Sequence, residues 1–312
     1  MTTRDSPFGN EPFRVGEAIA RGVGRGALDG PLFERPFHGV REWRHVDELD
    51  ARRSAQLSQS EIRLRAFRRR CRQFATRMHE GDFFSHSTAL VLHGAPTADA
   101  WDEAIHVSAI RPRNPARTKT VVSHRLAPRE PAAQRVAGLR IEAPDRAWVQ
   151  ASAHLPDVEL IVAADFLVAR SRRLATIDEL RAEASRMRCG RLQPLLDRVR
   201  EGSESPRETK LRLELIDAGL PEPELALELF RPDGGFAARL DLAYPAYRVG
   251  VEYDGRQHAE DVYQFARDAD RWRGIAELDW HLVRILHHHL WPDPGVAVDL
   301  VRRALVRAGW RR

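Results

Sequence analysis

Residues 236–258, FAARLDLAYPAYRVGVEYDGRQH, constrain the fold of this chain more than any other segment. Two strand-like apolar runs are separated by a proline-containing turn, a pattern that predicts an antiparallel hairpin. If Tyr244 and Tyr247 close this hairpin opposite one another, Asp241 pairs with Gly250. Strand alternation then determines which acidic side chains share a face.

That alternation predicts that Asp241, Glu252 and Asp254 lie on one face of the hairpin. Asp241 and Glu252 become diagonal neighbours, roughly 7–8 Å apart, so their carboxylates can share one divalent cation. Clustered carboxylates without a cation repel one another, and such clusters mark either metal sites or exposed surfaces. Both a metal-dependent site and an acidic strand edge remain open from these residues.

Neighbouring residues favour the metal-dependent alternative. Gly250 leaves room for a ligand opposite Asp241, and Gly255 allows a sharp turn after Asp254. His258 follows, and an imidazole with an ordinary pKa of about 6.5 can accept a proton from an attacking water. A bound metal would stabilise the negative charge that develops on a phosphate.

The hairpin belongs to a predicted domain at residues 203–312, a mixed sheet flanked by helices. A charged Gly/Ser stretch, RVREGSESPRE, marks its boundary near residue 200. Ser205 and Glu208 form a capping box around Pro206, which predicts a helix that ends at Gly219. The other expected elements are strands at 225–230 and 280–286 and helices at 262–278 and 295–309.

The N-terminal part is predicted to mix short strands and helices. Residues 11–45 contain a helical segment and a strand pair, and residues 60–81 form a helix with an apolar stripe and many arginines. We interpret the arginines Arg68–Arg70 and Arg72 as a solvated face, with phosphate binding as the alternative. His86, His93, His106 and His124 lack metal-ligand spacing and are interpreted as satisfied or exposed.

Composition sets broad limits on the protein. With 312 residues, 43% hydrophobic and 30% charged, we expect a folded, soluble chain of about two domains. No signal sequence or apolar run of membrane-spanning length occurs, so we expect a cytoplasmic protein without a membrane partner. Cys71 and Cys189 form no CxxC pattern and are interpreted as buried thiols. A net charge of +5 permits an anionic partner without requiring one.

The acids in this order resemble the PD-(D/E)xK nuclease core: Glu208 on a helix, Asp241 at a strand end, and Glu252 and Asp254 on the next strand. RLDLAYPAYRVGVEYDGRQH and the later LDWHLVRIL are similar to the very-short-patch-repair (Vsr-like) endonuclease branch. The resemblance covers residues 203–312. It implies that Asp241 and Glu252 hold Mg²⁺ or Mn²⁺, with Asp254, His258 and Glu208 also in the catalytic site.

One position departs from the wider superfamily, which has lysine where this chain has Asp254. Lys119 and Lys210 are the only lysines, and Lys210 cannot be assumed to substitute. The repair branch also lacks that lysine and relies on histidine, which makes His258 the residue on which activity most depends. Asp268 and Arg271 match a D-x-x-R pattern, or else form an ordinary helical ion pair.

A second resemblance covers residues 12–170. GDFFSHSTALVLHGAP, IHVSAI and GLRIEAPDRAWVQASAHL are similar to the AbiEi-type antitoxin region, and the preceding segment resembles that family's reduced winged-helix module. Residues 1–50 are therefore expected to form this module and residues 51–200 the antitoxin-like α/β region. Ser85 and His86 of the SHxTA segment are interpreted as packing or capping residues.

Together these features predict a magnesium-dependent DNA endonuclease with an N-terminal region that binds nucleic acid or a partner. The alternative is a non-catalytic, DNA-binding regulator of the antitoxin type that carries a degenerate nuclease fold. An interaction protein without nucleic-acid affinity is a third possibility. The sequence does not indicate an oligomeric state.

Overall fold

The computed structural model describes residues 8–44, 57–96, 103–254 and 271–311. The chain divides into two compact units, Met1–His154 and Leu155–Arg312. Both units combine helices with sheets, which confirms the predicted α+β class. Within the described ranges, no helix has both the length and the apolar character needed to cross a bilayer.

A small three-stranded sheet with order β1-β3-β2 opens the first unit. Its core is aromatic, because Phe33 packs edge-on against both Phe13 and Trp43. Two short helices lie between the first two strands, where the sequence predicted one helical segment. The elements are β1 (Phe13–Arg14), α1 (Val15–Ala20), α2 (Arg25–Leu28), β2 (Phe33–Glu34) and β3 (Val40–Trp43).

Helix α4 (Gln59–Ala75) confirms the predicted apolar stripe. Phe67, Cys71 and Phe74 are fully buried in the core of the first unit. Arg69 lies on the other side of the helix, but it is not merely solvated, since its guanidinium pairs with Glu42 on β3 at 2.9 Å. The interpretation of the whole arginine run as a solvated face is therefore wrong at this position.

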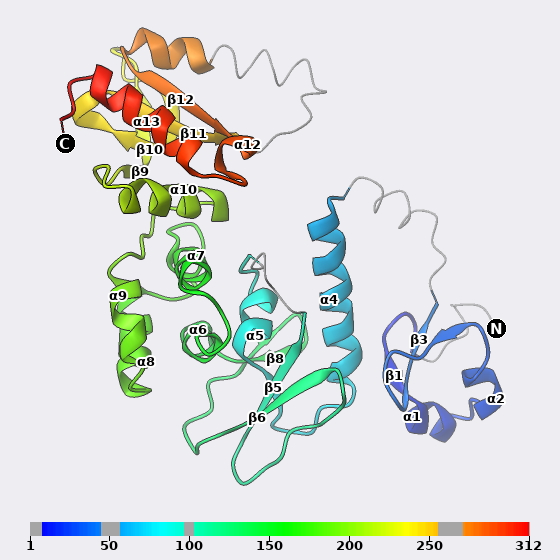
Figure 1. Cartoon of the computed structure of the whole chain (residues 1–312). Coiled ribbons are helices and arrows are strands. Elements are labelled where there is room, and N and C mark those ends of the chain that lie inside the picture. The colour runs from blue at the N-terminus through cyan, green and yellow to red at the C-terminus, as the bar shows by residue number, and fades with distance from the viewer. Residues whose placement is uncertain (1–7, 45–56, 97–102, 255–270, 312) are drawn as a thin grey trace. The chain divides into compact units, whose positions relative to one another are not determined.

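The larger sheet of the first unit has the order β6-β5-β4-β8-β7. Figure 1 labels three of its strands, β5, β6 and β8. β5 pairs in parallel with β6, and β4 pairs in parallel with β8, while the other two pairings are antiparallel. α5 begins directly after β4, and α6 follows β8. The bounds are β4 (Phe83–Phe84), α5 (His86–Leu92), β5 (Ile105–Ile110), β6 (Val121–Leu126), β7 (Gln134–Val136), β8 (Leu139–Ile141) and α6 (Pro144–Ala151).

Helices open the second unit, and the predicted boundary near residue 200 falls inside it. Asp165 on α7 forms a buried ion pair with Arg212 on α10 at 2.8 Å. Glu159 on α7 likewise pairs with Lys210 at 2.8 Å, so α7 and α10 pack as one body. The helical elements are α7 (Asp157–Val168), α8 (Ile177–Arg186), η2 (Gly190–Leu192), α9 (Gln193–Leu196) and α10 (Pro206–Asp217).

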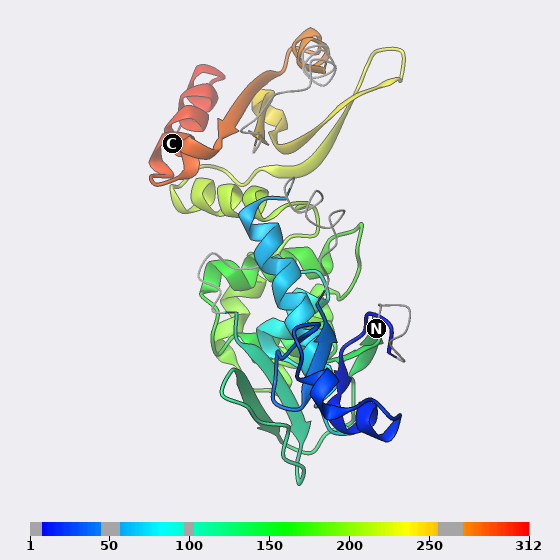
Figure 2. The same ribbon diagram turned by 90° about the vertical axis from the view of Figure 1, so that its right-hand side faces the viewer.

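The C-terminal sheet is mixed, as predicted, with the order β12-β11-β10-β9. The first three strands along the chain are antiparallel, and β12 joins β11 in parallel. The hairpin of β9 and β10 extends beyond the other two strands (Figure 2). The bounds are β9 (Glu224–Phe230), β10 (Phe236–Tyr244), η3 (Pro245–Tyr247), β11 (Val249–Asp254), β12 (His281–Leu286), α12 (His287–Leu290) and α13 (Gly295–Arg307).

Helices cover both faces of this sheet. Side chains of α10 and α13, such as Leu215 and Val301, pack with Val251 in one core cluster. On the opposite face Ile275, from the helical residues 271–277, packs with Leu240. The acidic residues of the hairpin lie beside this second helix.

Candidate functional site

Asp241 and Glu252 lie where the backbone ladder between β10 and β11 ends. The last paired residues are Leu242 and Val251, one step before the two acids. Just beyond that step, Oδ2 of Asp241 accepts a hydrogen bond from the backbone N–H of Tyr253 at 3.1 Å. The side chain of Asp241 thus satisfies a backbone donor beyond the last paired residues, and the two acids lie close enough for the charge on Glu252 to act on Asp241.

The predicted register of this hairpin is wrong by two residues. Tyr244 pairs with Val249 rather than lying opposite Tyr247. The turn is longer than expected, because η3 is a 3₁₀ turn and Arg248 after it adopts the left-handed conformation, with φ 49° and ψ 41°. An even shift leaves the same residues on each face, so the two carboxylates still meet.

Three acids from three elements interact at this strand end. Burial raises the pKa of Asp241 to about 6, and the charge on Glu252 adds to the effect. Burial also raises the pKa of Glu208 in the first turn of α10, where the charge on Asp241 contributes. The pKa of Glu252 is raised by burial although Arg271 opposes the shift. The ionised carboxylates are therefore destabilised here.

Arginines neutralise two of the predicted site residues. Arg271 donates to both carboxylate oxygens of Glu252, one of them at 3.0 Å, and to the backbone carbonyl of Arg239 at 2.8 Å. Arg284 pairs with Asp254 and lies 3.8 Å from the ring centroid of Trp272. Arg271 therefore contacts an acid of the sheet, whereas one prediction gave it only an ion pair with Asp268 within its own helix.

A hard cation is the ligand that the acidic residues could accept. Asp241 makes no ion pair with the described part of the chain, and Glu252 would supply a second carboxylate if Arg271, now bound to both of its oxygens, released it. Mg²⁺ and Mn²⁺ prefer carboxylate oxygen ligands, and a cation here would offset the mutual repulsion of the acids. Asp254 is directed toward Arg284, so the two strands offer a pair of carboxylates rather than three.

Gly250 serves packing and not ligand access, contrary to the sequence-based expectation. A Cβ added there would lie 2.8 Å from Cδ1 of Leu240, which is fully buried.

We expect Gly250→Ala to lower the free energy of unfolding by about 1–3 kcal/mol through overpacking. Urea unfolding checks this, with Gly274→Ala as the control because a Cβ at that glycine meets no atom within 4 Å. Equal stability of the two variants would contradict the assignment.

Other predicted residues have different outcomes. His258, Gly255 and Asp268 lie outside the described residues, so the proton-accepting role of His258 stays a prediction. Lys210 forms an ion pair with Glu159 and is not in the acidic cluster.

Glu208 lies in the first turn of α10, where its N–H donates to the Ser205 hydroxyl at 3.2 Å. Its carboxylate accepts from the backbone of Glu204 instead of completing the predicted capping box.

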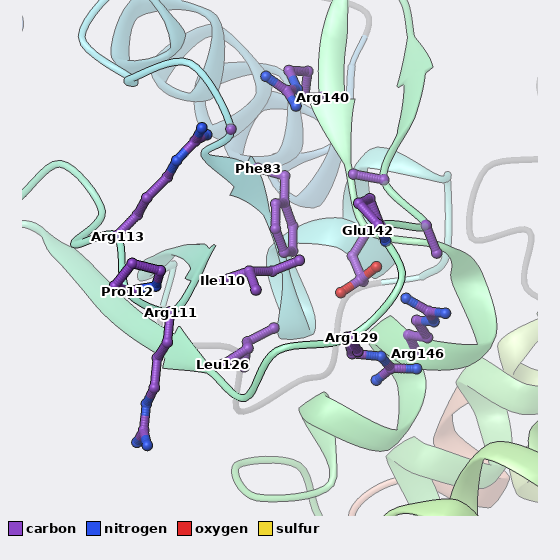
Figure 3. Close-up of a pocket in the computed structure, with 14 residues that line it drawn as sticks. Phe83, Ile110, Arg111, Pro112, Arg113, Leu126, Arg129, Arg140, Glu142 and Arg146 are labelled. Carbon is purple, nitrogen blue, oxygen red and sulfur yellow. The ribbon is translucent and has the colours of Figure 1, made fainter.

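The first unit contains an arginine-lined cavity that the sequence did not predict (Figure 3). Its volume is about 330 Å³, with Phe83 near its centre and one acid, Glu142, in the wall. Backbone carbonyls of Glu80 and Glu130 accept hydrogen bonds from the guanidinium groups of Arg113 and Arg146, and Figure 3 shows the arginines spread around the lining. No compact motif marks the lining, because the arginines are spread over several strands and loops. They are Arg111, Arg113, Arg129, Arg140 and Arg146.

Three histidines that the sequence left unconnected also lie together. One ring nitrogen from each of His86, His106 and His124 lies within 4.8 Å of the others. Ser85 precedes α5 but does not cap it; its hydroxyl lies 2.9 Å from Nδ1 of His86. The three side chains are satisfied by hydrogen bonds, as interpreted from the sequence, but their gathering at one place was not predicted.

No protein-family model matches the chain. Two curated proteins of Mycobacterium tuberculosis are similar to it, named Uncharacterized protein MT2308 (strain CDC 1551 / Oshkosh) and Uncharacterized protein Rv2248 (strain ATCC 25618 / H37Rv). Each is 32% identical over 157 residues, which cover 45% of this chain and 56% of the relative. The chain thus spans about half the length of the curated relatives it matches.

One solved structure is weakly similar, the crystal structure of the RV2827C protein from Mycobacterium tuberculosis. It has 18% sequence identity and a TM-score of 0.37, with 74% of this chain and 86% of that chain covered.

Proposed function

We propose that residues 203–312 form a nuclease that hydrolyses phosphodiester bonds of DNA with Mg²⁺ or Mn²⁺. The observation that carries this proposal is the pair of neighbouring carboxylates, Asp241 and Glu252, at the end of the β10–β11 ladder. Glu252 is buried and Asp241 is partly buried, and Asp241 forms no ion pair with the described residues. Such a pair is costly in the protein alone and favourable around a divalent cation.

The residues of the site have distinct roles in this proposal. Asp241 and Glu252 would hold the cation, which when bound polarises the phosphate and activates a water. Glu208 would be a supporting acid of the site, since it lies near enough to Asp241 for that charge to raise its pKa. Arg271 fixes Glu252 before a cation binds, and its guanidinium, partly exposed, can then turn toward a phosphate oxygen.

The first unit would bind the nucleic acid or a partner. Exposed arginines of α4, Arg65, Arg68 and Arg72, line a surface hollow that also includes Leu139 and Ile141 of β8. Arginine on one helical face is suited to phosphate contacts, which hold a nucleic acid without reading its sequence. This supports a role in DNA binding that does not depend on the acids of the second unit.

Metal-dependent cleavage tests the nuclease proposal. The full chain is incubated with single- and double-stranded DNA while Mg²⁺ or Mn²⁺ is titrated, and Asp241→Asn and Glu252→Gln are compared with the wild type. We expect cleavage that needs the cation and falls to background in both variants. Glu228→Gln is the matched control, because Glu228 is an exposed acid of the same sheet. Cleavage that persists in both site variants would contradict the proposal.

The second candidate is a non-catalytic DNA-binding regulator of the antitoxin type. The ion pairs of Glu252 with Arg271 and of Asp254 with Arg284 favour it, because they can stabilise a nuclease fold without a cation. This candidate predicts DNA binding that weakens as salt rises, is unchanged in Asp241→Asn, and is accompanied by no cleavage. Fluorescence anisotropy with labelled DNA, run on the same preparations, separates the two candidates.

A further inference from the structure

Four histidines gather in the first unit from elements that are far apart in sequence. His86 begins α5, His106 lies on β5 and His124 on β6, and His154 follows α6. The ring centroid of His154 is 4.9 Å from that of His106 and 5.6 Å from that of His86. The centroids of His106 and His124 are 5.1 Å apart, so the four rings surround one small volume.

Parallel pairing of β5 and β6 brings the central two rings together. His106 pairs with Val122 and Ser108 with His124, so the two histidines are diagonal neighbours on one face. Nδ1 of His106 lies 2.9 Å from Nε2 of His124. Two ligands at zinc–nitrogen distances of about 2.0–2.1 Å around a tetrahedral ion are roughly 3.3 Å apart. The observed nitrogens need to separate by only a few tenths of an ångström.

Hydrogen bonds around His86 leave one nitrogen for a ligand role. Nδ1 lies 2.9 Å from the Ser85 hydroxyl, which in turn accepts from the hydroxyl of Ser108 at 2.7 Å. Metal-binding histidines commonly use the second ring nitrogen in such an outer hydrogen bond, which fixes the tautomer and the ring orientation. Nε2 of His86 is therefore the nitrogen that can face an ion.

The backbone and the surroundings of His86 are specialised. Its φ is 53°, in the left-handed region that non-glycine residues seldom adopt. Its N–H donates to the side-chain oxygen of Gln150 at 3.2 Å, which helps to hold this conformation.

We propose that His86, His106 and His124 bind a single Zn²⁺ ion. The exposed His154 lies outside the set of nitrogens within 4.8 Å of one another, and in this proposal it turns inward to become the fourth ligand. Imidazole nitrogens suit Zn²⁺, and four of them allow the closed tetrahedral coordination of a structural site. Binding moves the stacked rings of His86 and His124, now 3.7 Å apart between centroids, away from each other. This site lies in the first unit and does not rest on the proposed nuclease activity.

Zinc binding by the full chain tests the proposal. Protein stripped with a chelator is titrated with Zn²⁺ by calorimetry, and Co²⁺ is bound in parallel to record the visible absorption typical of tetrahedral coordination. We expect saturation at one ion per chain and a rise in Tm on binding. His124→Asn is the main variant, because His124 is only partly buried and we expect its replacement to cost less stability than that of the buried His86 or His106.

Loss of an outer hydrogen-bond partner weakens metal binding by about 10–100-fold. We therefore expect Ser85→Ala to weaken zinc binding in that range and His124→Asn to weaken it by at least about 100-fold. His154→Asn should weaken binding and change the Co²⁺ spectrum, since it removes the fourth ligand. Urea unfolding of the metal-free variants confirms that each is folded.

The run His287–His289 is the necessary control, because consecutive histidines can take up metal nonspecifically. Its rings lie at the start of α12, in the second unit. Replacement of these three residues by asparagine is expected to leave the zinc stoichiometry and affinity unchanged. Zinc binding that this control abolishes, or that His124→Asn leaves at wild-type affinity, would overturn the proposal.

Discussion

Asp165→Ala is expected to lower the free energy of unfolding by about 3–5 kcal/mol, a large part of the stability of a typical domain. The Asp165 carboxylate is buried and accepts hydrogen bonds at 2.8 Å from the Arg212 side chain, the Thr209 hydroxyl and the backbone N–H of Arg200. Nε and Nη1 of Arg212 have no hydrogen-bond partner in the described part of the chain. Without Asp165, the buried guanidinium loses its counter-charge.

Urea unfolding measures this loss as a lower midpoint with an unchanged slope. Asp217→Ala is the matched control, because its ion pair with Arg198 is largely exposed and should contribute less than about 1 kcal/mol. Burial raises the pKa of Asp165 even though Arg212 opposes the shift. The cost of removing both charges from water therefore offsets much of their attraction. We expect the double variant Asp165→Leu/Arg212→Met to have a free energy of unfolding far closer to that of the wild type than Asp165→Ala has. Similar losses in Asp165→Ala and Asp217→Ala would contradict the expectation.

Asp241→Asn is expected to stabilise the metal-free protein by about 2–3 kcal/mol at pH 8. The folded-state pKa of Asp241 is about 6, above the ordinary value of 3.8. The folded state thus binds the proton more tightly than the unfolded state. This contribution to stability is fully present below pH 3.8 and is lost as pH rises through 6. Asparagine carries no charge and avoids the loss, while its side-chain oxygen can still accept from Tyr253.

Thermal or urea unfolding at several pH values checks this prediction. The advantage of Asp241→Asn should shrink toward zero as the pH falls to about 4, where Asp241 itself is protonated. Mg²⁺ should raise the Tm of the wild type and have little effect on the variant, because a cation stabilises only the ionised carboxylate pair. Glu228→Gln controls for a general effect of removing negative charge. A destabilised Asp241→Asn protein at pH 8 would argue against the buried acidic pair.

The hairpin shows which features of the candidate site can be predicted from the sequence and which cannot. Alternation depends only on local geometry, so the shared face of Asp241 and Glu252 could be predicted from the apolar pattern. Register depends on the turn, and the left-handed conformation of Arg248 has no marker such as glycine or asparagine. The ion pair of Glu252 with Arg271 was also unpredictable, since it depends on where a later helix packs against the sheet.

The histidine cluster was missed for a different reason. His106 and His124 meet through parallel pairing of β5 with β6, and the sequence does not reveal whether successive strands pair in parallel. His86 joins them from the start of α5, with a left-handed backbone conformation that the sequence does not mark. Metal sites built from residues scattered among several elements leave no spacing motif, in contrast to sites held within one loop or helix.

The contacts between α7 and α10 determine where the chain can be divided. A fragment that begins at residue 203, where the composition changes, would leave Asp165 and Glu159 behind and keep their partners Arg212 and Lys210. A fragment that begins at Leu155 keeps both pairs, and with them the packing of α7 against α10, the helix that carries Glu208. We therefore expect the smallest independently folding fragment that carries the candidate nuclease site to be longer than residues 203–312, the segment that resembles a nuclease. Ion-pair partners of its first helix lie about forty residues upstream of residue 203.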